Sequence, residues 1–453
     1  MIIYYKTNPS RLMLSGFILT ILTGTFVLLL PPFTTAGHIS FIDALFTATS
    51  AVCVTGLTVL DTGTDFTLVG QVVILAMFQL GGIGIVFFSV LFAMVFMGRA
   101  SVGQKSMFSA LMTPHAALDA WGVFRTIVSF TLAVELLGAL FLFVPMLSVT
   151  DGDFPQAIFY ALFHSISGFC NAGFSLMSTS FEGLRTDYLA TGTLMVLIVT
   201  GGLGFFVIDD VMQYIRMKRA HRVTIHSKMV LLTSLLLIVA GAALVFVFEK
   251  YNTLESEGLI PSIMDSLFMS VTARTAGFNT IRVSELANPT IFALIILMFI
   301  GASPGSTGGG VKTSTLAVIW FLIISRYKGQ DHVFAFRRTI PEETISQAQA
   351  ILATSMALVM VVTMCILVSE VRQGTGVFME RDYFVASLFE VISAFGTVGL
   401  STGITPYLTT INKAFIALTM FVGRLGPLTV LMALKRRAHT ADYVYAEENI
   451  LVG

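Results

Sequence analysis

Charged residues are scarce in this chain. The 26 basic and 26 acidic residues among 453 make only 11% charged residues, and the formal net charge is zero. A soluble globular domain carries about 25% charged residues. The composition therefore argues against a chain of soluble domains. Zero net charge gives no reason to expect a bulk electrostatic partner such as nucleic acid.

Cysteine and catalytic motifs are also sparse. The three cysteines, Cys53, Cys170 and Cys365, lie in apolar surroundings without CxxC spacing, which predicts neither a disulfide framework nor a metal site. The sequence contains no Walker motif, no HExxH and no Ser-His-Asp spacing. An intramembrane enzyme would need paired catalytic residues in its apolar segments. We find none, so we expect a protein that is not an enzyme and has no cofactor.

Hydrophobic residues supply 55% of the chain and gather in long runs. Residues 229–248, for example, are long enough to cross a bilayer, which takes roughly 20 residues. The first run follows Lys6 and Arg11 and is longer than the apolar region of a signal peptide, so it is predicted to be a membrane helix. The sequence predicts an all-α protein with membrane lipid around it.

A short apolar segment that begins with Phe and ends in a glycine turn recurs four times. From Phe to Gly the step is ten residues in three copies and nine in the third. The copies begin at Phe46, Phe163, Phe268 and Phe389, and their turns are Val54-Thr55-Gly56, Asn171-Ala172-Gly173, Thr275-Ala276-Gly277 and Thr397-Val398-Gly399. Such regular recurrence indicates four related units.

Glycine can adopt backbone angles that turn successive carbonyl oxygens toward a common point. Four Thr-Val-Gly-Tyr-Gly loops do this in the potassium-channel filter, where carbonyls replace the hydration shell of the ion. The alternative for one such glycine is a helix C-cap or a close-packing position. Because four occur in register, we predict that all twelve turn residues form a selectivity filter for potassium.

The apolar runs on either side of each turn predict eight transmembrane helices and four re-entrant pore helices, which would form four membrane–pore–membrane repeats with pseudo-fourfold symmetry. The repeats span residues 1–98, 99–216, 217–328 and 329–453, and the last includes the C-terminal tail. A pore segment of about 12 residues covers only some 18 Å, too little to cross. Basic residues concentrate at the termini and between the repeats, which predicts that those parts are cytoplasmic and that the glycine turns face outward.

The glycine turns, the run 301–312 and the segment Gly423-Arg424-Leu425-Gly426-Pro427 resemble the Trk/Ktr/HKT superfamily of potassium transporters. The resemblance covers nearly the whole chain and is greatest to the bacterial Ktr-type membrane subunit. It implies potassium uptake across the plasma membrane, a homodimer with the tail 446–453 at its interface, and cytosolic nucleotide-binding RCK subunits. The alternative is a sodium-conducting or sodium/potassium-coupled relative. The glycine at position 56 argues against a sodium-conducting protein, because a serine at the first filter glycine accompanies sodium selectivity in plant members of the superfamily.

Five glycines and a proline between residues 301 and 310 must break the second helix of the third repeat. The resemblance implies an intramembrane gate there, with an arginine beneath the filter contacting it. The alternative for that arginine is a side chain reaching the cytoplasmic interface. The predicted gate residues are Gly301, Ser303, Gly305, Ser306, Thr307, Gly308, Gly309, Gly310, Lys312 and Arg424.

Several other residues have structural interpretations. Asp43 and Asp265 are expected at helix starts rather than at the ion, and Arg274 is expected to brace its pore segment or to reach the outer surface rather than to face an ion. His164 is expected to be a hydrogen-bonded structural residue, and Glu135 has no predicted partner. The glycines of 81–84 and 201–204 are interpreted as close helix packing.

Overall fold

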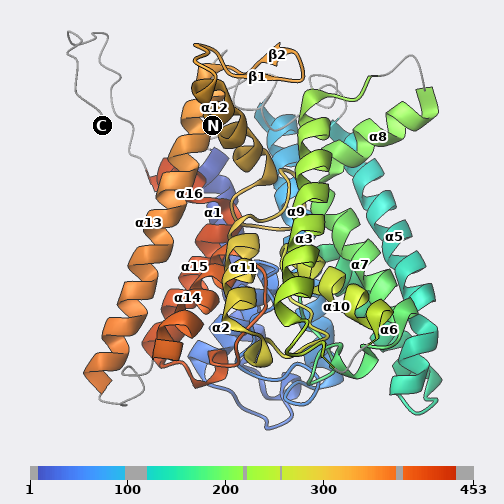
Figure 1. Ribbon diagram of the computed structural model, residues 1–453. Coiled ribbons are helices and arrows are strands. Elements are labelled where there is room, and N and C mark those ends of the chain that lie inside the picture. Colours follow the sequence, from blue (N-terminus) through green and yellow to red (C-terminus); the bar gives the residue numbers. More distant parts are fainter. Residues whose placement is uncertain (1–8, 97–119, 218–221, 256–257, 374–380, 435–453) are drawn as a thin grey trace, which may run out of the picture.

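The computed structural model describes residues 9–96, 120–217, 222–255, 258–373 and 381–434. Most of this part is helical (Figure 1). The one sheet among the described residues is a small antiparallel hairpin of β1 (Phe334–Ala335) and β2 (Arg338–Thr339). The hairpin lies at the opposite end of the molecule from α2, α6 and α10 in Figure 1.

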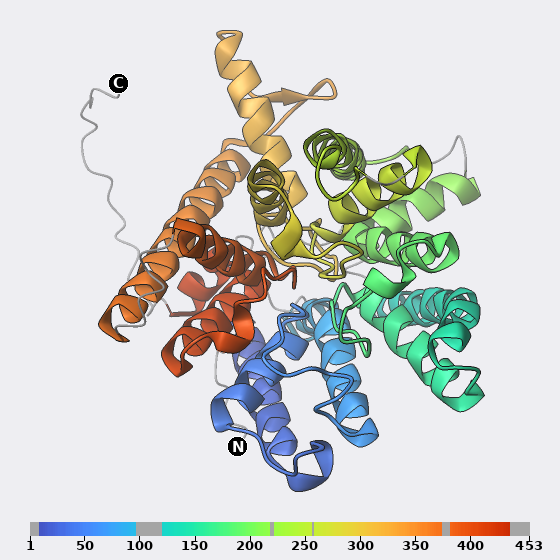
Figure 2. The ribbon, with the colours of Figure 1, turned by 60° about the horizontal axis from the view of Figure 1, so that its bottom comes forward.

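The helices follow one another in four groups, each with a long helix, a shorter one and a further helix or pair. The first group is α1 (Pro9–Leu28), α2 (Phe41–Val52) and α3 (Leu68–Phe96); the second is α5 (Ala120–Val149), α6 (Phe154–Cys170), α7 (Tyr188–Leu203) and α8 (Phe205–Met217). The third is α9 (Ile225–Glu249), α10 (Leu259–Thr272), α11 (Asn288–Phe299) and α12 (Thr313–Tyr327); the fourth is α13 (Glu342–Gln373), α14 (Arg381–Gly396), α15 (Thr410–Leu425) and α16 (Pro427–Leu434). Figure 2 shows them as blue, green, yellow and orange-red sectors around a common centre.

Polar side chains mark where two of the shorter helices begin. The Ser40 hydroxyl accepts a hydrogen bond from the backbone N–H of Asp43 at the start of α2, and Asp153 caps α6 in the same way. These caps satisfy N–H groups that have no partner within the helix. The Phe that opens each sequence motif is at most 1% exposed, which fixes each shorter helix against the core.

Three glycines let other helices lie directly against the ends of the shorter helices. A Cβ added at Gly81, Gly201 or Gly423 would collide with a backbone carbonyl oxygen at the end of α2, α6 or α14, respectively. No side chain fits at these contacts, and small residues permit such close backbone approach between helices. The packing interpretation of Gly81 and Gly201 is confirmed.

The apolar runs 189–211 and 413–434 do not form single straight helices. α7 and α8 meet at an angle of 98°, and α15 and α16 meet at 92°. The residues at the bends, Gly204 and Gly426, have φ angles of 87° and 84°. These left-handed conformations interrupt the helical hydrogen-bond ladder, which glycine permits without the clash of a Cβ. The predicted break after α11 is confirmed, because residues 300–312 form a loop before α12.

By length and apolar composition, three helices of the described part could each cross a membrane: α5, α9 and α13. Five could do so if each bent pair counts as one span. The other apolar helical stretches, which include Met13–Leu28 of α1 and Leu68–Gly84 of α3, have 10–17 residues. The count of eight spans and the repeat boundaries therefore stay predictions. The predicted docking tail 446–453 lies outside the described residues.

Candidate functional site: four glycine turns above a crossing loop

The four predicted turns share one backbone conformation. The first residue of each turn, Val54, Asn171, Thr275 or Thr397, has φ between 51° and 80°. The glycine two positions later has φ between 70° and 96°. A non-glycine residue rarely adopts positive φ, so its occurrence at the same position four times is informative. Alternation of backbone conformation along a short segment can turn successive carbonyl oxygens to the same side.

The glycines Gly56, Gly173, Gly277 and Gly399, called here the glycine ring, lie next to one another in chain order. A Cβ added to any of them would come within 2.9 Å of the carbonyl oxygen of the next turn's middle residue. Those oxygens belong to Ala172, Ala276, Val398 and Thr55, so the last contact returns to the first turn. Glycine is therefore required at all four positions by φ and by space.

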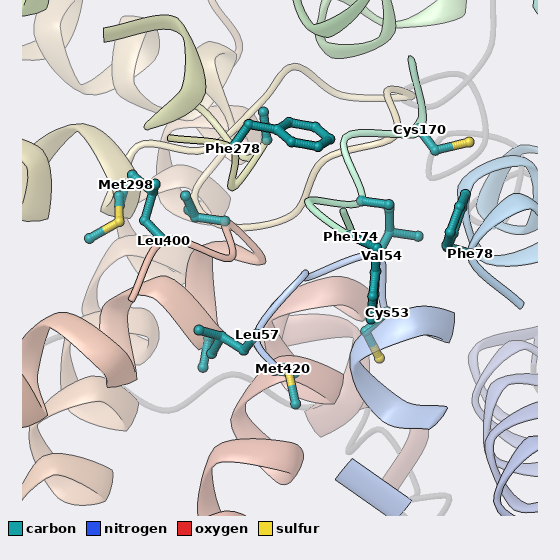
Figure 3. Packing of buried hydrophobic residues seen from close by; sticks show 14 of the residues in the cluster. Cys53, Val54, Leu57, Phe78, Cys170, Phe174, Phe278, Met298, Leu400 and Met420 are labelled. Carbon is teal, nitrogen blue, oxygen red and sulfur yellow. The ribbon is translucent and has the colours of Figure 1, made fainter. Parts of the chain in front are cut away.

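Hydrophobic side chains pack around the ring from the residue that follows each glycine. Leu57, Phe174, Phe278 and Leu400 are at most 1% exposed and come from four differently coloured segments in Figure 3. Phe174 also stacks on Phe78 of α3, with ring centroids 5.9 Å apart. The ring is thus enclosed by well-packed apolar residues, which restrict its movement.

A hydroxyl residue braces each turn, and the sequence interpretation missed it. The hydroxyls of Ser50 and Ser393 accept hydrogen bonds from Gly56 and Gly399 N–H, both at 3.1 Å. Those of Ser167 and Thr272 donate to the carbonyls after the glycine, at 2.8 and 2.6 Å. All four lie four residues after the motif's Phe. The recurrence Phe-x-x-x-Ser/Thr could have identified them.

A polar hollow of about 400 Å³ opens on the glycine side of the turns. Residues following all four glycines line it, and Asp61, Glu182 and Arg282 contribute charge. Arg282 donates to Glu182 at 3.0 Å. This hydrogen bond and the charge of the carboxylate raise the pKa of the Arg282 guanidinium. The local charge of this arginine is compensated, so the hollow is not dominated by an unpaired cation.

The 300–312 loop lies against the other side of the turns. The Gly309 N–H donates to the Thr397 hydroxyl at 2.8 Å, and the Asn171 amide is 3.1 Å from the Thr307 hydroxyl. A Cβ at Gly308 would collide with the Thr275 side chain. The loop therefore packs against the first residue of three turns, and its glycines permit that approach.

Backbone hydrogen bonds tie the loop to neighbouring helices. Ser303 and Thr307 N–H donate to the carbonyls of Gly202 and Gly201, at 3.1 and 3.3 Å. Two more backbone hydrogen bonds connect the loop to other helices, from Phe205 N–H to Gly305 O and from Gly310 N–H to Gly423 O. Within the loop, the Ser306 hydroxyl donates to Ser303 O, and a bridge between Ile300 and Val311 lies beside Gly301. The predicted gate residues thus lie together in space.

Arg424 is 2% exposed and lies beneath the turns. Its guanidinium donates to the Thr307 carbonyl in the loop and, at 2.7 Å, to the Gly81 carbonyl in α3. Lys312 donates to Gly308 O at 2.6 Å. Within the described ranges, neither cation has a carboxylate within 4.0 Å. Backbone carbonyls stabilise both side chains, and Arg424 points into the protein interior rather than to its surface.

The two aspartates predicted at helix starts are paired with basic side chains away from the ring. Asp43 is in the first turn of α2, as predicted, and binds Lys413 at 2.7 Å. Asp265 lies in the body of α10, so its helix-start interpretation is wrong. It binds Arg185 at 2.6 Å and accepts from the Thr280 hydroxyl at 3.0 Å. A buried carboxylate needs such partners wherever it lies.

Arg274 and Glu135, which the sequence analysis singled out, also have hydrogen-bond partners. Arg274 is 8% exposed and donates to the carbonyl of Ser234 in α9 at 3.1 Å, which agrees with its predicted bracing role. Glu135 accepts from Gln79 at 3.1 Å, a contact between α5 and α3 that sequence spacing could not reveal. No group of three or more potential ligands for a metal occurs among the side chains of the described segments.

Several known proteins resemble this chain over nearly its whole length. The sequence profile of TrkH, described as a cation transport protein, matches residues 15–440. The chain is 36% identical to the Ktr system potassium uptake protein B of Bacillus subtilis, covering 99% of this chain and 98% of that protein. It is 34% identical to the potassium/sodium uptake protein NtpJ of Enterococcus hirae, over 99% and 98%.

A solved structure supports the fold independently. The potassium transporter TrkH from Vibrio parahaemolyticus superposes with a TM-score of 0.71 at 17% identity, covering 96% of this chain and 86% of the other. At that identity the likeness concerns the fold. Together with the profile match, the full-length relatives and the apolar helices, it shows that this chain is a multi-pass membrane protein that belongs to the Trk/Ktr family of cation transport proteins.

Proposed function

We propose that the chain takes up potassium ions across the plasma membrane through one path between the four turns. The observation that carries this proposal is the glycine ring, in which four turns of equal backbone conformation meet in chain order. Carbonyl oxygens of Val54, Thr55 and their counterparts in the other turns would replace the water around the ion. Ions would arrive through the polar hollow.

The closed path is proposed to end at the 300–312 loop. Its packing against Asn171, Thr275 and Thr397 leaves it directly below the turns. Arg424 would hold it there through the Thr307 carbonyl and place a positive charge where a cation would pass. Opening then requires the loop to move and the carbonyls bound by Arg424 and Lys312 to find other partners.

Substitutions in the glycine ring test the proposed filter directly. At Gly56 and Gly399, serine would introduce a Cβ against a neighbouring carbonyl at positive φ. Strain of this kind costs about 1–3 kcal/mol, and roughly 1.4 kcal/mol corresponds to a tenfold change in an equilibrium. In cells lacking their own potassium uptake, Gly56→Ser and Gly399→Ser should lower the ratio of K⁺ to Na⁺ uptake by about tenfold.

Gly37→Ser is the matched control. Gly37 also has positive φ, at 72°, but a Cβ there would meet nothing within 4 Å. Its K⁺/Na⁺ ratio should equal that of the parent. Parental ratios in both ring variants, at parental amounts in the membrane, would remove the glycine ring from the selectivity site.

Sodium conduction or sodium/potassium coupling is the second candidate, because one full-length relative is named a potassium/sodium uptake protein. Four glycines in the ring favour potassium. The same uptake assay decides between the two, since a sodium-conducting chain would take up Na⁺ as fast as K⁺, and coupling would make K⁺ uptake depend on external Na⁺.

We also propose a homodimer that binds cytosolic RCK-type subunits through its cytoplasmic loops, with both termini in the cytoplasm. The naming of two relatives as protein B of a Ktr system implies a further component for those proteins. Co-purification of the chain with such a subunit, and its loss when the basic loops are neutralised, would test this assembly.

A further inference from the structure

The position immediately after the motif's Phe differs among the four shorter helices. It holds Thr47, His164, Met269 and Glu390, all at most 3% exposed. Met269 is apolar, and among the described residues the Thr47 hydroxyl has no hydrogen-bond partner. His164 and Glu390 instead bind the chain just beyond the glycine of their own turn.

Glu390 fastens the segment after Gly399. One carboxylate oxygen accepts from the Ser401 hydroxyl at 2.7 Å and from the Thr402 N–H at 2.9 Å. The other oxygen accepts from the Thr405 hydroxyl at 2.7 Å. No basic side chain of the described segments lies within 4.0 Å of it. A buried carboxyl group is costly unless hydrogen-bonded, so these donors and Glu390 depend on one another.

His164 does the same for the segment after Gly173. Its Nε2 accepts from the Leu176 N–H at 3.3 Å and is 3.1 Å from the Ser175 hydroxyl. Its Nδ1 is 2.7 Å from the carbonyl oxygen of Tyr160. Because Nε2 accepts a backbone N–H, we assign the proton to Nδ1, which donates to Tyr160. The imidazole thus joins the body of α6 to the chain beyond the turn.

The two attachments are equivalent in register and lie across the ring from one another. Ser175 and Ser401 each follow the glycine by two residues. Gly173 and Gly399 each approach Gly56 and Gly277 as neighbours, which makes them the opposite pair. We propose that His164 and Glu390 are positioning residues that fix two opposite turns of the glycine ring and thereby set its width along that diagonal.

This inference rests on the proposed filter. A filter that discriminates between cations depends on how far its oxygens can approach a smaller ion, and side chains behind the filter limit that approach. Removing the hydrogen bonds of His164 or Glu390 should allow the carbonyl oxygens of that turn to move closer to Na⁺. The K⁺/Na⁺ uptake ratio should fall by about twofold to tenfold, the range that one hydrogen bond of ordinary net strength represents.

The test compares Glu390→Ala and His164→Leu with Glu390→Gln and Thr47→Val. Both removals should lower the K⁺/Na⁺ ratio. Glu390→Gln keeps an oxygen that can accept from Ser401 and Thr402, so it should restore most of the ratio. Thr47→Val changes the equivalent position but removes no hydrogen bond, so the ratio should match the parent.

Ser401→Ala and Ser175→Ala remove the hydroxyls that donate to Glu390 and His164. These two variants test the inference if the Glu390 and His164 variants do not reach the membrane. Parental K⁺/Na⁺ ratios in the folded removal variants, or in both serine variants, overturn the inference, as does an equal fall in Thr47→Val. If Gly56→Ser lowers the ratio while these variants do not, only the positioning roles fail. If the glycine variants also leave the ratio unchanged, the filter itself is wrong.

Discussion

Arg424 is the buried side chain that we propose holds the path closed. Its guanidinium joins the Thr307 carbonyl of the loop to the Gly81 carbonyl of α3. A cation at this depth costs several kcal/mol unless it has partners, so each partner is also held by the cation. Removing the side chain would release the loop and would remove the positive charge from the proposed path.

We therefore expect Arg424→Ala to raise the K⁺ flux. A hydrogen bond to a charged group contributes about 1.5–3 kcal/mol, so its loss from a predominantly closed state should increase the flux by roughly tenfold or more. Potassium uptake by reconstituted vesicles measures this. Arg424→Lys keeps the charge and should stay nearer the parent, and a folded Arg424→Ala that conducts no faster would show that this arginine does not close the path.

Among the elements, the 300–312 loop is distinguished by what its glycines touch. Gly308 and Gly309 pack directly against the side chains of Thr275 and Thr397. Deletion of residues 306–309 should remove the barrier and raise K⁺ flux, while the K⁺/Na⁺ ratio stays close to the parent because the ring is unchanged. The same vesicle assay with both ions measures the two quantities.

Gly308→Ala is a milder change at the same place, because it adds only a Cβ, which would collide with Thr275. It should shift the loop away from the turns and increase flux in the same direction. Unchanged flux in both loop variants, with parental amounts in the membrane, would favour a role for these glycines in packing alone.

The first and last helix groups are joined by an ion pair. Lys413 at the start of α15 binds Asp43 at the start of α2, and the two side chains are 13% and 20% exposed. A double-mutant cycle with Asp43→Asn and Lys413→Met should give a coupling of about 1 kcal/mol, because the pair is largely shielded from water. Thermal unfolding of the detergent-solubilised protein measures it.

The Arg282–Glu285 pair is the control for that cycle. Its side chains are 60% and 57% exposed, so its coupling should be close to zero. Equal coupling in the two cycles would show that the contact between the first and fourth groups has no special contribution to stability.

For the whole molecule, the proposed orientation places the polar hollow outside the cell and the β1–β2 hairpin inside. Ser284 lines the hollow and is exposed, whereas Asp331 is exposed just before the hairpin. A membrane-impermeant maleimide should label Ser284→Cys in intact cells and Asp331→Cys only after permeabilisation. The parent, in which Cys53 and Cys170 are buried and Cys365 is half-buried, is the control. The reverse labelling pattern would contradict the orientation.

The sequence by itself determined the features that depend on local backbone chemistry. The step from Phe to glycine located all four turns, and the glycines of 301–310 located the break between α11 and α12, because both depend on where glycine is required. The bends at Gly204 and Gly426 escaped prediction, since glycines within an apolar run are also compatible with a straight, closely packed helix.

Only the tertiary structure decided which polar groups meet. Arg424 reaches Thr307 across 117 positions of the chain, and Lys413 reaches Asp43 across 370. Glu135 and Gln79 similarly come from different helices. A buried polar group must find a hydrogen-bond partner somewhere, but sequence spacing specifies the partner only within one helix or turn. Across helices, packing makes that choice, because it fixes which backbone carbonyls lie within reach of each side chain.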